Sequence, residues 1–250
     1  MTTVAREEFT DVWIRGWGLW ILLGMAVTLS SVAIGLAYTS QINLLDAREG
    51  LAILVRISLG VGLLLAAFAA ADAISGERDR STLECILLTP TPPRSLVAGK
   101  LVVAFVWWLA AFVVSLPYLW AMGVGLGGSA ALVVAGIIGA LLAVTLTAVA
   151  GTASILSRSN LHAFGFVFLI TGVLAVPGLL PAAMMRGSIG SAVLRIDPVA
   201  AAQHVINTVI VDQQPLADVV TWMISPVVGA VVAVAVVARA ARRIALEPRS

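Results

Sequence analysis

Long apolar runs dominate the chain, and short polar connections separate them. A helix needs about 20 apolar residues to cross a bilayer, and six runs are long enough. The runs are continuous, without the alternation of apolar and polar positions that is typical of barrel strands. The pattern therefore predicts an all-α membrane protein with six transmembrane helices: Trp17–Tyr38, Leu51–Ala71, Leu101–Val124, Ala130–Leu156, Ala163–Met184 and Val219–Ala238.

Residues 1–16, ahead of the first span, predict an amphipathic N-terminal interface helix. Phe9 and Trp13 fall on one helical face, and Arg15 lies away from it. Tryptophan favours the boundary between membrane and water. We expect this helix to lie along the cytoplasmic surface; a straight extension of the first span is the alternative.

Residues 185–218 connect the fifth and sixth spans and are too apolar for a solvated loop. Asp197 followed by Pro198 is typical of a helix start. We expect a short helix from Pro198 to about Ile210, in an outer re-entrant segment covered by protein. Pro177 and Pro181 are expected to kink or end the fifth span.

Composition supports one membrane domain over residues 1–250. Hydrophobic residues make up 60% of the chain and charged residues 11%, against about 25% charged in soluble domains. The net charge of +2 indicates no nucleic-acid partner, and the single cysteine, Cys85, excludes an internal disulfide. Arginine and alanine usage is typical of GC-rich bacteria, so we expect the cytoplasmic (inner) membrane.

The distribution of basic residues predicts the orientation. Eleven Lys and Arg residues fall in connections on one side of the predicted spans, and three fall on the other. Basic residues accumulate in cytoplasmic connections. Both termini and the polar loop over residues 72–100 are therefore expected in the cytoplasm.

That loop holds the largest concentration of charge. Ser81 with Glu84 three positions later has the spacing of a capping box. It predicts a short helix over Thr82–Leu88, which Pro90 and its neighbours stop. Such a helix could dock in a groove of a partner and transmit a push. An ordinary interfacial loop with solvated charges is the alternative.

The segment Glu77–Pro90, followed by Gly99 and Lys100, resembles the signature of ABC-2 type transporter permeases, the membrane subunits of type V ABC exporters. Ser81 stands where glycine is usual in that family, and a capping serine can form a similar turn. The interface helix, the six spans and the outer segment are also similar to that family.

The resemblance implies that a separate ABC ATPase subunit binds ATP and Mg, so that this chain holds no cofactor. It implies a second permease subunit, in a homodimer or heterodimer within the lipid bilayer. The loop helix would be the coupling helix that docks on the ATPase. The implied docking residues are Glu77, Arg78, Ser81, Thr82, Leu83, Glu84, Leu87, Leu88 and Pro90, with Phe9, Trp13 and Arg15 in the interface helix.

The sequence gives little support for ATP binding, metal binding or catalysis by this chain. Gly99-Lys100 lacks the first glycine and the hydroxyl residue of a phosphate-binding loop, so energy must come from a partner or an ion gradient. His162 and His204 fall on opposite sides of the predicted membrane and cannot share a metal. No catalytic residues or metal ligands are expected.

The predicted spans carry few charges. Arg56 lies near an outer end, where it can snorkel, and Asp72 stands alone at an inner end. A proton-coupled transporter would need a chain of buried carboxylates, so the pattern argues against one and favours hydrophobic or amphipathic cargo. The resemblance implies that this cargo is exported with ATP. Two alternatives stay open: a secondary transporter driven by an ion gradient, and a non-transporting membrane anchor or immunity protein. Ala135, Gly139 and Ala143 are spaced for close helix packing.

Overall fold

The computed structural model describes residues 18–39, 44–80, 93–179 and 188–244, which form helices with short connections. Six helices in these ranges are long and apolar enough to cross a membrane, and no strand occurs in them. The predicted all-α class with six spans is confirmed. The elements are α2 (Gly18–Thr39), α3 (Leu44–Asp79), α5 (Pro93–Gly123), α6 (Gly128–Leu156), α7 (Asn160–Leu179), α8 (Ser188–Ile196), α9 (Pro198–Ile206), η1 (Asn207–Val211), η2 (Leu216–Val219) and α10 (Val220–Ile244).

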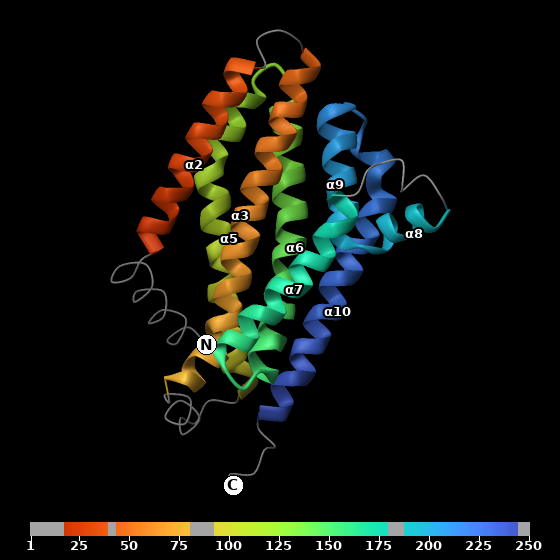
Figure 1. Cartoon of the computed structure of the whole chain (residues 1–250). Helices are drawn as coiled ribbons and strands as arrows, with labels where there is room; N and C mark the ends of the chain where they lie inside the picture. The colour runs from red at the N-terminus through yellow and green to blue at the C-terminus, as the bar shows by residue number, and fades with distance from the viewer. Residues whose placement is uncertain (1–17, 40–43, 81–92, 180–187, 245–250) are drawn as a thin grey trace.

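The long helices form a bundle in which successive helices run in opposite directions (Figure 1). α3, α6 and α10 end, and α5 and α7 begin, at the same end of this bundle. We call this end the inner side, because the distribution of Lys and Arg predicts that it faces the cytoplasm. The opposite end, where α2 finishes and α3 begins, is the outer side.

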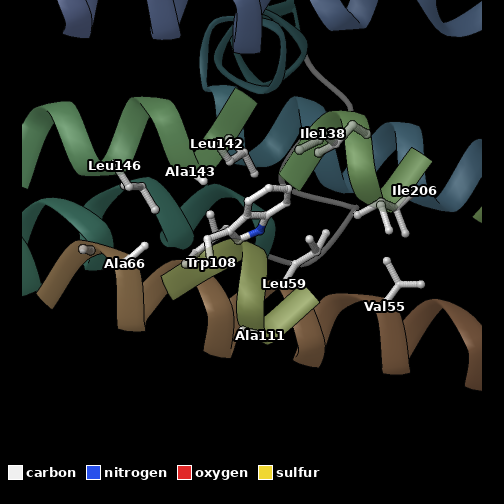
Figure 2. Close-up of a cluster of buried hydrophobic side chains, with 14 of the residues drawn as sticks. Val55, Leu59, Ala66, Trp108, Ala111, Ile138, Leu142, Ala143, Leu146 and Ile206 are labelled. Carbon is white, nitrogen blue, oxygen red and sulfur yellow. The ribbon is translucent and has the colours of Figure 1, made fainter. Parts of the chain in front are cut away.

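The centre of the bundle is built from α3, α5 and α6, and Trp108 of α5 lies in the middle of it (Figure 2). Its ring stacks on that of Phe112, with centroids 5.5 Å apart. A Cβ atom at Gly139 of α6 would lie only 2.7 Å from the Trp108 ring and 2.6 Å from the Leu59 side chain of α3. Glycine therefore allows the three helices to approach closely, which confirms the predicted packing role of Gly139.

α2 and α7 lie at the edges of the bundle. In the apolar window of each helix 11% of the residues are buried, against 56% in α3 and in α6. Trp20 of α2 and Phe168 of α7 are among their exposed apolar side chains. In a bilayer such surfaces face lipid tails or another protein chain.

On the outer side, α9 and η1 pack against α3, α6, α7 and α10. The Asp197 carboxylate accepts from the backbone N–H of Val199 (2.8 Å) and of Ala200 (3.3 Å), and Pro198 opens the helix. These contacts confirm the predicted helix start at Asp197-Pro198. η1 is a π-helical turn in which the Asp212 N–H bonds to the Asn207 carbonyl at 3.1 Å. Entry of this unit into the outer leaflet stays a prediction.

Helices extend into the range 72–100 that was predicted as a polar loop, from both of its ends. α3 continues to Asp79, and α5 already begins at Pro93. The helix continues past the apolar run because its polar residues find partners on α5, α6 and α7, so that helical backbone need not stop where hydrophobicity stops.

Two further boundaries differ from the prediction. The second span was expected from Leu51, but α3 begins at Leu44. Pro177 lies inside α7, which is described to Leu179, so it does not end the fifth span at that residue. Pro181 and residues 1–16 lie outside the described residues.

Candidate functional site

Two of the predicted docking residues, Glu77 and Arg78, lie on the last turns of α3. The other predicted site residues lie outside the described residues: Ser81, Thr82, Leu83, Glu84, Leu87, Leu88 and Pro90 in the predicted coupling helix, and Phe9, Trp13 and Arg15 in the predicted interface helix. The candidate site is therefore built from the helix ends that flank residues 81–92.

An ion pair joins these two helix ends. The Lys100 ammonium on α5 lies 3.3 Å from Glu77 Oε1 on α3, and the side chains are only 5% and 20% exposed. A pair shielded from water to this extent interacts more strongly than a surface pair. The end of α3 and the start of α5 are thereby held together at the base of residues 81–92.

A second ion pair runs along α3 itself. Arg80 Nη2 donates to Asp72 Oδ2 at 3.1 Å, two helical turns away. The Asp72 carboxylate lies against Gly76, in the space that a Cβ atom at position 76 would occupy. Glycine at position 76 is thus required by this arrangement.

Asp72 also takes part in a junction with the start of α7. Asn160, the first residue of α7, donates from Nδ2 to Asp72 Oδ1 at 2.6 Å and accepts from Ser75 Oγ at 2.9 Å. Its backbone N–H donates to Asp79 Oδ2 at 2.8 Å. Carboxylates near a helix N-terminus are favourable for the helix dipole, so the last turns of α3 stabilise the start of α7.

The end of α6 joins the same junction. Ser154 Oγ accepts from the backbone N–H of Ile74 (3.0 Å) and of Ser75 (2.9 Å). Both serine side chains are fully buried. Arg78 donates to the Ser157 carbonyl at the end of α6. We call this set of contacts between α3, α5, α6 and α7 the inner junction, formed by Asp72, Ser75, Glu77, Arg78, Asp79, Arg80, Lys100, Ser154 and Asn160.

A cavity of about 560 Å³ opens beside the inner junction, between α2, α3 and α5. Asp72, Glu77, Arg80 and Lys100 line its polar part. Its remaining wall is apolar and includes Ile21, Leu65, Phe68, Val103 and Trp107. A cavity with a charged and an apolar wall fits a molecule that has a polar head and an apolar body.

Sequence reasoning missed most of the inner junction. The sequence placed Asp72 at the inner end of its span, but its two partners there, Arg80 and Asn160, were not predicted. The spacing of Asp72, Gly76 and Arg80 along one helix was an available signal. The contribution of Asn160 had no signal in the sequence, because it comes from 88 residues away.

In a comparison with protein-family models, residues 2–243 match the model of the family described as ABC-2 family transporter protein. The match covers nearly the whole chain and includes every element of the inner junction. A search of curated proteins gave no match.

Proposed function

The chain belongs to the ABC-2 transporter family, and from this premise we propose that it is the permease subunit that a separate ABC ATPase drives to export a hydrophobic or amphipathic substrate. Family membership supports the description of the chain as a multi-pass transporter membrane subunit. The observation that carries the mechanical part of the proposal is the inner junction, which ties the two helix ends flanking residues 81–92 to the rest of the bundle.

The proposed mechanism starts with the ATPase gripping the coupling helix over Thr82–Leu88. A displacement of that helix moves α3 and α5 together, because Lys100 and Glu77 link them. Asn160 carries the same movement into α7 through its three bonds to α3. Rigid helices with satisfied polar contacts transmit such a displacement better than flexible loops.

The inner cavity supports amphipathic cargo. Its apolar wall can hold hydrocarbon while its charged wall holds a polar head, and it lies at the inner side of the bundle, where the proposal places the inner leaflet. In this proposal two permease subunits and two ATPase subunits form the complex, ATP and Mg are bound by the ATPase, and both termini face the cytoplasm of a bacterium.

The test replaces Glu84 with Arg in the full chain, co-expressed with a candidate ABC ATPase subunit from the same genome. We expect Glu84→Arg to lose most of the co-purifying ATPase and its ATP hydrolysis in nanodiscs, because an inverted charge opposes docking. Arg249→Gln is the matched control, since it changes one cytoplasmic charge outside the predicted docking residues. Unchanged ATPase binding and hydrolysis in the Glu84 variant would contradict the proposed docking.

Two readouts separate this proposal from the alternatives. A secondary transporter would move substrate in proteoliposomes with an ion gradient and no ATPase. An anchor or immunity protein would retain its partner without any substrate flux. Either result would overturn the proposed export cycle.

A further inference from the structure

A second polar cavity, of about 460 Å³, lies on the outer side between α3 and η1. Its charged and amide lining consists of Glu49, Arg56, Asn207 and Asp212. Glu49 and Asp212 are exposed and Arg56 is partly buried. The acids are therefore accessible to water, while the guanidinium is more enclosed.

Arg56 is incompletely satisfied within the described residues. Its Nη2 donates to Asn207 Oδ1, but its Nε is buried and has no hydrogen-bond partner there. A buried donor without a partner is costly, and most such donors in native proteins are paired. Because that Nε atom is buried, a bound group can meet only the part of the guanidinium that lines the cavity, and arginine readily binds phosphate.

The charges are ordered along the direction that crosses the membrane. Glu49 lies near the outer end of α3, and Arg56 follows seven residues later, which is about 10 Å further toward the centre of the bundle. The cavity thus presents negative charge outside and positive charge deeper. In an outer leaflet, an amine-bearing phospholipid has the complementary order, with its ammonium outermost and its phosphate deeper.

We propose that the cavity of Glu49, Arg56 and Asp212 binds a phosphoethanolamine headgroup of an outer-leaflet lipid. Arg56 takes the phosphate, and Glu49 and Asp212 take the ammonium at the mouth of the cavity. Ala52 and Ile53, which also line it, provide apolar surface for the glycerol end of the lipid. The headgroup would brace η1 against α3.

This site is separate from the inner cavity. The two cavities share no lining residue, and on α3 nine residues separate Arg56 of the outer cavity from Leu65 of the inner one, which is about 14 Å along the helix axis. The outer cavity is therefore a distinct site, and the proposal made for it does not depend on ATPase docking.

The test measures lipid retention on the delipidated full chain by native mass spectrometry. Phosphatidylethanolamine and phosphatidylglycerol of identical acyl chains are added, since only the first carries an amine. We expect preferential retention of phosphatidylethanolamine. Glu49→Gln should reduce that preference roughly threefold, as for an exposed charge pair, and Arg56→Gln should weaken binding of both lipids roughly tenfold. Equal retention of the two lipids, unaffected by Glu49→Gln, would overturn the proposal.

Two controls separate binding from folding. Asp218→Asn changes an exposed outer acid that does not line the cavity and should leave retention unchanged. Asn207→Ala removes the bond between η1 and Arg56 but keeps the guanidinium, so it should weaken lipid retention less than Arg56→Gln does. Equal losses in Asn207→Ala and Arg56→Gln would assign Arg56 a purely structural role and refute the site.

A competition arm identifies the source of the headgroup. Soluble O-phosphoethanolamine at millimolar concentration should fail to displace the lipid, because it lacks the apolar portion. Displacement by the soluble compound would overturn the lipid assignment.

Discussion

At its inner end α3 is tied to α5, α6 and α7 through polar side chains that satisfy one another, whereas near its outer end Arg56 donates to Asn207 beside an open cavity. The difference shows that one helix can carry two kinds of polar site. At the inner end, many contacts between side chains resist deformation. At the outer end, the incompletely paired guanidinium of Arg56 can bind a ligand. Loss of a contact should therefore cost more at the inner end.

The largest effect is expected from Lys100→Met. The substitution leaves the largely shielded Glu77 carboxylate without its ammonium, and breaking a buried pair costs about 3 kcal/mol. The apparent Tm of the purified chain should fall by roughly 6 °C or more, measured by thermal unfolding in detergent. Adding Glu77→Gln should recover part of the loss. A drop no larger than for an exposed residue would show that the pair does not hold the helix ends together.

Gly76→Ala should have the next largest effect and lower the free energy of unfolding by about 2 kcal/mol. The added methyl group displaces the Asp72 carboxylate and weakens its bonds to Arg80 and Asn160. Gly60→Ala is the matched control on the same helix, because nothing lies within 4 Å of its added Cβ atom. Alanine favours a helix over glycine, so the control should be neutral or more stable in the same assay. Identical behaviour of the two variants would argue against the role of Asp72.

Ser154→Ala is expected to lower the free energy of unfolding by about 1 kcal/mol. It removes the buried oxygen that accepts from Ile74 and Ser75. Hydrogen exchange of these two amides should accelerate relative to amides in the middle of α3. Unchanged protection would place the stability of this helix end elsewhere.

Asn207→Ala at the outer end should have the smallest effect and lower the free energy of unfolding by about 0.5 kcal/mol. Water can replace the amide at Arg56 because the cavity is open. Thermal unfolding of the delipidated chain measures the difference. A loss as large as that of Lys100→Met would remove the contrast between the two ends of α3.

The sequence predicted the features that depend on local pattern. The six spans follow from continuous apolar runs, the start of α9 from Asp197-Pro198, and the close approach of α6 from Gly139 in a series of small residues. Each depends on residues that are close together along the chain.

The features that the sequence did not predict depend on distant pairs. Arg56 was expected to snorkel toward water, but α3 begins seven residues earlier than expected, and Asn207, 151 residues away, binds the guanidinium instead. Asp72 and Asn160 likewise meet only in the folded chain. A single sequence contains no signal for such pairs. A hydropathy pattern places the end of a span at the first charged residues, although the helix itself can continue beyond them.

The attachment of α7 has a mechanical consequence. Asn160 fixes its first residue to α3, while most of its length is exposed at the edge of the bundle. A helix of 20 residues is a lever about 30 Å long with its pivot at Asn160. A tilt of roughly 5° about that pivot would move the far tip by about 2.6 Å over this length, so a small rotation beside the predicted motor contact becomes a larger sweep on the other side of the membrane.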